Sequence, residues 1–197
     1  MAALVAGQSR RDQILAAVLD VVRAEGWTSI SMRRVADRTG ITATALYRHF
    51  DGKDALVGAA VDVALAALMS RVALASLDAS SGEGRLWASL EEIRGFAVDE
   101  PDLYAFIFFS HDPARGAASS EPAPTNNRLM DALETQVAGW ISESGASSEA
   151  AEVAAVVAAQ AHGLVLLWRR GRFENTEAFA DFYRKAFWIL LAGIGNQ

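Results

Sequence analysis

The twelve residues from Thr42 to Lys53 concentrate side chains that donate hydrogen bonds or carry positive charge. Thr44, Tyr47 and Arg48 follow the spacing i, i+3, i+4, which places them on one face of a helix. Hydroxyl, phenol and guanidinium groups bind phosphate oxygens and base edges in the major groove of DNA. The segment therefore indicates a nucleic-acid surface. The alternative is a solvated basic face on which Tyr47 and His49 form a half-buried pair that closes a small helical core.

Three short helices are expected to hold these side chains in place. Helices are predicted over 10–25, 32–39 and 43–50. Ser31 is a typical N-cap for the second of them, and Gly40 ends it at a turn. The inner face of the third helix is predicted to consist of Ala43, Leu46 and Phe50. The arrangement is typical of a helix-turn-helix that packs on an earlier helix.

The composition of the 197 residues favours an all-helical protein, because 52% are hydrophobic, alanine is abundant and only 4 are proline. Further helical patterns extend over about 52–75, 85–98, 102–109, 127–144, 148–170 and 176–194. An irregular loop is expected between about 111 and 127. We predict a helix-turn-helix domain over 1–53, a connecting helix over 53–75 and a larger helical domain over 76–197.

The net charge of −6 is distributed unevenly along the chain. Residues 1–53 hold eight Arg or Lys against five Asp or Glu, which gives +3, whereas residues 54–197 have a net charge of −9. A basic N-terminal domain attached to an acidic body indicates that only the N-terminal domain contacts nucleic acid.

No catalytic, metal or cofactor site is expected. Cysteine is absent, the three histidines His49, His111 and His162 are scattered, and the sequence has no phosphate-binding glycine loop. The apolar run 153–168 is sixteen residues long and therefore shorter than a membrane span. We expect a cytoplasmic protein that is not an enzyme and does not enter the membrane.

The stretch GWTSISMRRVADRTGITATALYRHFDGKDALVGAAVD closely resembles the N-terminal DNA-binding domain of the TetR family of bacterial transcriptional repressors. The matching positions are Gly26-Trp27, Ser31-x-Arg33, Val35-Ala36, Gly40-Ile41, Leu46-Tyr47-x-His49-Phe50 and Lys53-x-x-Leu56. The resemblance covers about Arg10 to Val63.

The resemblance also implies which residues contact DNA. Base contacts are implied for Arg33, Ala43 and Thr44. Contacts to phosphates and sugars are implied for Thr28, Thr42, Tyr47, His49 and Lys53. Arg48 fits either role, and Arg34 opens its helix on the same side. Many family members have serine in place of Thr42 and glycine in place of Thr44, so the base preference of the family does not carry over to this chain.

By the same resemblance, the body beyond about residue 75 binds a small-molecule effector and forms a homodimer. The last two helices are apolar on more than one face, which agrees with a four-helix interface between two copies. The bulky residues that could line a hydrophobic pocket are Trp87, Phe96, Phe106, Phe109, Met130, His162 and Leu166. Ordinary core packing is the alternative for each of them.

The sequence thus predicts a homodimeric repressor that a small hydrophobic ligand releases from a palindromic operator in double-stranded DNA. Two alternatives stay open. One is a regulator whose ligand promotes DNA binding or that has no ligand. The other is a helical small-molecule-binding protein with a vestigial DNA-binding head.

Overall fold

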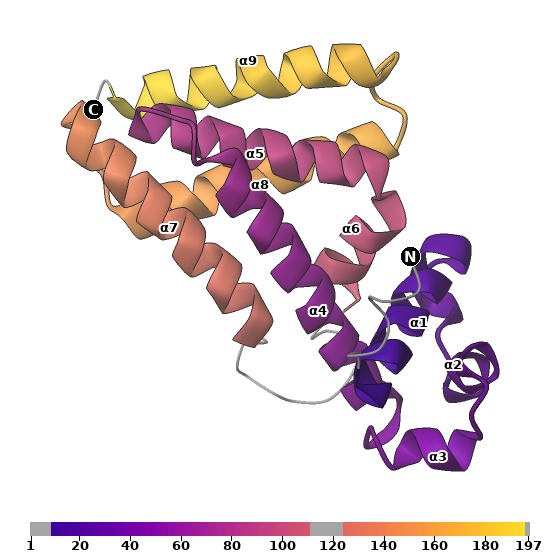
Figure 1. Ribbon diagram of the computed structural model, residues 1–197. Coiled ribbons are helices and arrows are strands. Elements are labelled where there is room, and N and C mark those ends of the chain that lie inside the picture. Colours follow the sequence, from indigo (N-terminus) through magenta and orange to yellow (C-terminus); the bar gives the residue numbers. More distant parts are fainter. Residues whose placement is uncertain (1–8, 111–123, 196–197) are drawn as a thin grey trace. The chain divides into compact units, whose positions relative to one another are not determined.

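The computed structural model describes residues 9–110 and 124–195, with side chains from residue 128 onward in the second range. All regular elements in these ranges are helical, which confirms the all-α prediction (Figure 1). The helices are α1 (Arg10–Glu25), η1 (Trp27–Ser29), α2 (Met32–Thr39), α3 (Ala43–Tyr47), α4 (Gly52–Ala75), α5 (Gly82–Asp99), α6 (Pro101–Phe109), α7 (Pro124–Ser144), α8 (Ala150–Arg169) and α9 (Thr176–Gly195).

Three boundaries differ from the sequence prediction by three residues, and the others differ by two at most. α5 begins at Gly82 and not at about Arg85. α3 ends at Tyr47 and not at Phe50, because the next two N–H groups bond three residues back: that of Arg48 to the Ala45 carbonyl oxygen at 3.2 Å and that of His49 to the Leu46 carbonyl oxygen at 3.0 Å. Phe50 follows the end of α3 and is buried. α7 begins at Pro124, three residues before the predicted start. The rest of the predicted irregular loop, residues 111–123 with His111, lies outside the described residues.

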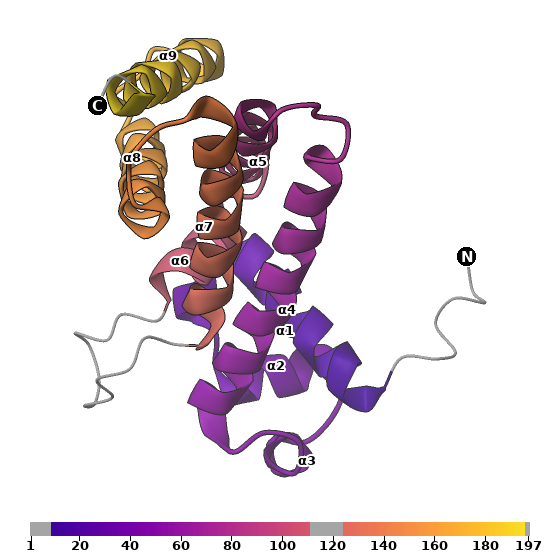
Figure 2. The ribbon, with the colours of Figure 1, turned by 90° about the vertical axis from the view of Figure 1, so that its left-hand side faces the viewer.

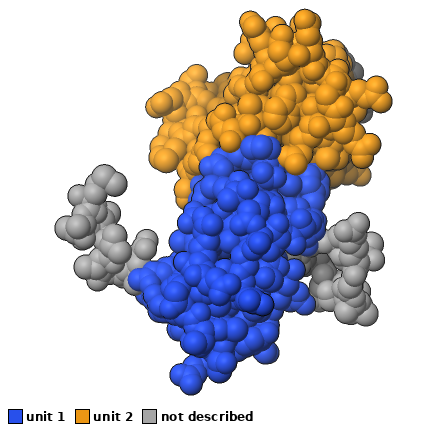
Figure 3. Space-filling model, turned by 90° about the vertical axis from the view of Figure 1, so that its right-hand side faces the viewer, with its two compact units in different colours: residues 1–67, 100–119 blue, residues 68–99, 120–197 orange. Residues whose placement is uncertain are grey.

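The chain divides into two compact units, coloured separately in Figure 3. One unit comprises residues 1–67 and 100–119, and the other comprises residues 68–99 and 120–197. α6 belongs to the first unit, whereas the sequence analysis assigned it to the second domain. The reason is that α6 packs on α1 and η1 and buries five consecutive residues from Leu103 to Ile107. The functional boundaries near residues 53 and 75 stay predictions.

In the first unit α1 supplies much of the core. Its buried residues are Ile14, Leu15, Ala17, Val18, Val21 and Val22. Gly26, at φ 78°, ends the helix, and its N–H bonds to the Val22 carbonyl oxygen at 2.9 Å. Arg23 Nε donates to the Glu100 carboxylate at 3.2 Å, which links the end of α1 to the residue that precedes α6.

In the second unit α7 packs against both α5 and α8, and α8 packs against α9 (Figures 1 and 2). The Gln160 side-chain amide donates to the Ala186 carbonyl oxygen at 2.9 Å and joins the last two helices. α5 begins against α7: the Glu143 carboxylate accepts from the Gly82 N–H at 2.5 Å and from the Arg85 guanidinium at 2.6 Å. These contacts fix the spacing of α5 and α7.

Two helices, α4 and α8, are long and apolar enough to cross a membrane when only length and composition are considered. The buried share of the most apolar window is 44% in α4 and 33% in α8. This evidence for a span is weak, because the core helix of a soluble protein meets the same criteria. The sequence pattern points to residues 153–168 as an apolar run, and α4 does not stand out in it.

Candidate functional site

The turn between α2 and α3 has the capping expected for a helix-turn-helix. Ser31 Oγ accepts from the Arg34 N–H at 3.2 Å and starts α2. Gly40 adopts a left-handed conformation at φ 65°, which a residue without Cβ reaches easily, and the Ile41 N–H returns to the Ala36 carbonyl oxygen at 3.1 Å. Thr42 Oγ1 then accepts from the Ala45 N–H at 3.1 Å and starts α3. Local sequence therefore determines this turn.

α3 is a short helix that two side chains hold in place. Leu46 is 0% exposed and Phe50 is 4% exposed. Burial of each contributes roughly 1.5–3 kcal/mol. The Arg11 guanidinium lies 4.4 Å from the centre of the Phe50 ring and covers it from the α1 side. Because α3 has its partners on one side only, its other side faces away from the unit (Figures 1 and 2).

All of the residues predicted to contact DNA are exposed. They are Thr28, Arg33, Arg34, Thr42, Ala43, Thr44, Tyr47, Arg48, His49 and Lys53. Tyr47 is 56% exposed, which contradicts the alternative that Tyr47 and His49 are a half-buried core pair. The prediction that Ala43 packs inward is wrong, because the first turn of so short a helix projects beyond the core that Leu46 reaches. The structure therefore brings a row of hydroxyl, phenol and cationic groups to one free surface.

The cations on this surface differ in what they already bind. Arg34 forms an ion pair with Glu25, so part of its charge is compensated. Among the described residues, Arg33, Arg48 and Lys53 form no ion pair. A polar hollow beside α2 is lined by Glu25, Ser29, Ser31, Arg33, Arg34, Asp37 and Arg38. Arg38 was missed from the sequence, although it follows Arg34 by four residues and thus lies on the same face of α2.

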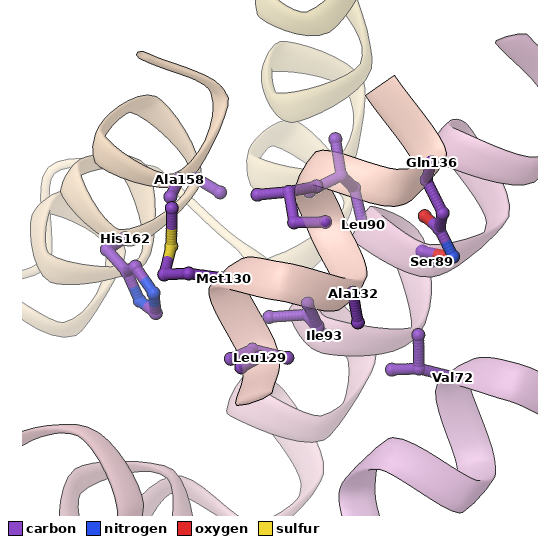
Figure 4. A pocket seen from close by; sticks show the side chains of 12 residues that line it. Val72, Ser89, Leu90, Ile93, Leu129, Met130, Ala132, Gln136, Ala158 and His162 are labelled. Carbon is purple, nitrogen blue, oxygen red and sulfur yellow. The ribbon is translucent and has the colours of Figure 1, made fainter. Parts of the chain in front are cut away.

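The second unit contains a pocket between α5, α7 and α8 (Figure 4). Its void measures about 500 Å³, including the part that is open to solvent. The lining residues are Val72, Ser89, Leu90, Ile93, Leu129, Met130, Ala132, Leu133, Gln136, Ala158, Ala161 and His162. A largely apolar lining with a few polar groups is the composition typical of small-molecule sites.

Two of the seven predicted pocket residues, Met130 and His162, line this pocket. Burial lowers the pKa of His162, so the imidazole is neutral at neutral pH. Ser89 and Gln136 were missed from the sequence. Their only sequence signal is that each is a polar residue beside an apolar residue in a predicted helix, and no spacing rule singles them out.

The other five predicted pocket residues lie elsewhere. Trp87 packs on α9, with its ring centre 5.3 Å from that of Phe187, and Phe96 is buried beneath Arg71. Phe106 and Phe109 belong to α6 in the first unit, and Leu166 is exposed. Sequence alone cannot distinguish these roles, since bulky apolar residues serve cores, pockets and interfaces equally well. Within residues 9–110 and 124–195, no group of His, Asp and Glu side chains is arranged to hold a metal ion.

Two family models match this chain. Residues 14–60 match the family model "Bacterial regulatory proteins, tetR family". Residues 86–189, more than half of the chain, match "Tetracyclin repressor-like, C-terminal domain". The chain belongs to the TetR family. It is a TetR-family transcriptional regulator with a DNA-binding helix-turn-helix domain and a helical C-terminal domain. The family consists of regulators and not of enzymes.

Individual proteins similar to this chain share little sequence identity with it. The nucleoid occlusion factor SlmA of Yersinia enterocolitica is 27% identical over 136 residues, which is 66% of this chain and 65% of that protein. A TetR-like transcriptional regulator from Rhodococcus sp. RHA1 is 20% identical with a TM-score of 0.66, over 94% of this chain and 98% of its own. The regulator FadR from Bacillus subtilis, in complex with stearoyl-CoA, is 13% identical with a TM-score of 0.75, over 94% of this chain and 100% of its own. These two structures share the fold.

Proposed function

We propose that the chain is a homodimeric repressor that binds a palindromic DNA operator and leaves it when a small hydrophobic effector enters the pocket of the second unit. The α3 face carries the proposal, because Thr44, Tyr47 and Arg48 are exposed while Leu46 and Phe50 anchor the helix. A helix with this division of side chains suits the major groove. Such a protein works in the cytoplasm, where the chromosome lies, and needs no membrane.

The dimer is supported by apolar side chains that α8 and α9 leave exposed in the single protomer. They are Val156, Leu166, Leu167, Phe182, Trp188 and Ile189. Val156 and Leu167 are three helical turns apart, and Phe182 and Ile189 are two turns apart, so each pair shares one face of its helix. A second copy that covers these faces removes them from water and provides two α3 helices for two half-sites.

The chain connectivity offers a route from effector to DNA. α5 lines the pocket, and only Glu100 separates α5 from α6, which packs on α1 in the DNA-binding unit. The contact of Arg23 with Glu100 ties the same connecting residue to α1. An effector that displaces α5 therefore acts on the first unit through one residue of backbone. The effector can change the affinity for DNA only by as much as its own affinity differs between two arrangements of the DNA-binding units in the dimer.

The experiment is a mobility-shift titration with DNA from the promoter beside the protein's own gene, repeated at increasing salt. Tyr47→Ala should weaken binding by about tenfold or more, because a hydrogen bond to a charged phosphate contributes about 1.5–3 kcal/mol. Its thermal stability should be unchanged, since the ring is exposed. Arg48→Gln should flatten the salt dependence by a slope of about 0.9 for each protomer, or about 1.8 for the homodimer. Arg128→Gln, an exposed arginine of α7, is the matched control and should leave the slope unchanged.

Three results contradict parts of the proposal. If no sequence-selective shift is seen even at low salt, DNA binding is excluded and the small-molecule-binding alternative is favoured. If effector tightens binding, the protein is a regulator whose ligand promotes DNA binding. If Tyr47→Ala unfolds the first unit, the tyrosine is a core residue and not a DNA contact.

A further inference from the structure

The pocket between α5, α7 and α8 has two hydrogen-bond acceptors on its polar side, Gln136 Oε1 and Ser89 Oγ. Gln136 Oε1 on α7 is buried, and no described residue donates a hydrogen bond to it. Ser89 on α5 is 3% exposed, and its hydroxyl donates to the Arg85 carbonyl oxygen at 3.0 Å. Since that proton is already in use, Ser89 Oγ has only acceptor capacity left. Two neighbouring helices therefore contribute acceptors to the same pocket.

The remaining lining carries no charge. None of the twelve residues is Asp, Glu, Lys or Arg. His162 lies on the opposite side of the pocket from Gln136 (Figure 4), and its imidazole is neutral because burial lowers its pKa. A carboxylate or ammonium group placed in this pocket would lose its hydration without gaining a counter-charge, which strongly disfavours charged ligands.

We propose that the effector is an uncharged, mainly apolar molecule whose polar end donates a hydrogen bond to Gln136 Oε1, as an alcohol or a primary amide does. The inference rests on the proposed function, because it names the chemical class of ligand for that pocket. A buried acceptor without a donor costs free energy, and a ligand donor removes this cost. An ether or ester presents only further acceptors and leaves Gln136 unsatisfied. The pocket therefore selects for donors.

The test compares two isomers that differ in one property. 1-Hexanol carries an O–H donor, whereas methyl pentyl ether has the same atoms and only an acceptor. Titration of the full-length protein by calorimetry should show 1-hexanol binding about three- to tenfold more tightly than the ether. Hexanoate and hexylammonium should not bind. In Gln136→Leu the preference for 1-hexanol should shrink, because the unpaired acceptor is gone, only Ser89 Oγ is left to accept, and the apolar volume is kept.

Gln160→Leu is the matched control in the same unit. Gln160 donates to the Ala186 carbonyl oxygen, so its loss should lower thermal stability while the preference for the alcohol remains. Gln136→Leu removes an unpaired acceptor and should keep or raise thermal stability. A role of Gln136 in folding alone would change stability without changing the preference between the isomers.

Several outcomes overturn the inference: equal binding of the two isomers to the unmodified protein, preference for the ether or for hexanoate, no binding of either neutral isomer, or an unchanged preference in Gln136→Leu. The promoter-DNA shift, measured on the same preparation, is an independent readout of the proposed function. If the shift persists and the alcohol preference is absent, only the ligand class is wrong. If the shift itself is absent, the repressor proposal fails.

Discussion

Gly82→Ala tests whether the close contact between α5 and α7 determines the stability of the second unit. A Cβ atom at this position would lie 2.8 Å from Trp140 Cα and 2.9 Å from Trp140 N, whereas carbon atoms pack best at about 3.5–4.0 Å. The obstacle is backbone, so no side-chain rotation relieves the clash and the start of α5 must move away from α7. This movement also stretches the hydrogen bond from the Gly82 N–H to Glu143.

The expected magnitude follows from two opposing effects. Overpacking costs about 1–3 kcal/mol, and the higher helix propensity of alanine returns at most about 1 kcal/mol. We expect Gly82→Ala to lower the free energy of unfolding by about 1–2 kcal/mol. Gly95→Ala is the matched control in the last third of α5, where a Cβ meets nothing within 4 Å. That variant should raise the free energy of unfolding by about 0.5–1 kcal/mol.

The assay is urea unfolding followed by tryptophan fluorescence at one fixed protein concentration, because a dimer's apparent stability depends on concentration. The midpoint should fall in Gly82→Ala and rise in Gly95→Ala, with unchanged slopes. If the two variants shift the midpoint in the same direction, the close approach of α5 to Trp140 does not control stability and the reasoning is refuted.

Two further predictions concern the dimer and pH. Ile189→Arg should give a folded monomer in sedimentation experiments. The Ile189 side chain is 73% exposed in the protomer, so its replacement should change the free energy of unfolding by less than about 0.5 kcal/mol, whereas a dimer would have to bury two arginines. A persistent dimer would show that this face of α9 is not the interface. Burial lowers the pKa of His162 from 6.5 in the folded protein. Because the unfolded chain therefore takes up the proton at a higher pH, the free energy of unfolding should decrease as the pH falls below about 6.5. The decrease should level off below the pKa of the folded state. Urea unfolding of His162→Gln should lack this slope, and a slope that survives would assign it to another group. The pKa of Glu143 is lowered from 4.5, mainly by the hydrogen bond from the Gly82 N–H and next by that from Arg85. The contribution of this carboxylate to the free energy of unfolding is therefore lost only in a separate window at lower pH.

The helix-turn-helix was predictable from sequence because its determinants are local. Ser31 and Thr42 cap their helices within three residues, and Gly40 occupies the left-handed position between them. Leu46 and Phe50 recur on the inner side, which leaves Thr44, Tyr47 and Arg48 on the outer side. Even here the prediction failed at Ala43, whose exposure depends on how far α3 projects beyond the core and not on helical periodicity.

The pocket was much less predictable. Apolar residues on α5, α7, α8 and α9 have the same hydrophobic signal whether they fill a core, line a cavity or face a partner. Of seven bulky candidates, only Met130 and His162 line the cavity, while the polar residues Ser89 and Gln136 that define its chemistry carried no spacing rule. The grouping of α6 with the first unit likewise depends on its packing against α1. These two helices are far apart in the sequence, so no local pattern predicts that they meet.

Sequence by itself determined the helical class, the turn and caps of the DNA-binding head, the outward cationic face and the family resemblance. These properties depend on residues within one or two helical turns of each other, so local rules are enough. Only the tertiary structure decided which residues surround the pocket, that Gln136 Oε1 is left without a donor, and that Gly82 lies against the backbone of Trp140. Such features arise where helices distant in sequence meet, and their contacts depend on the exact spacing and rotation of those helices.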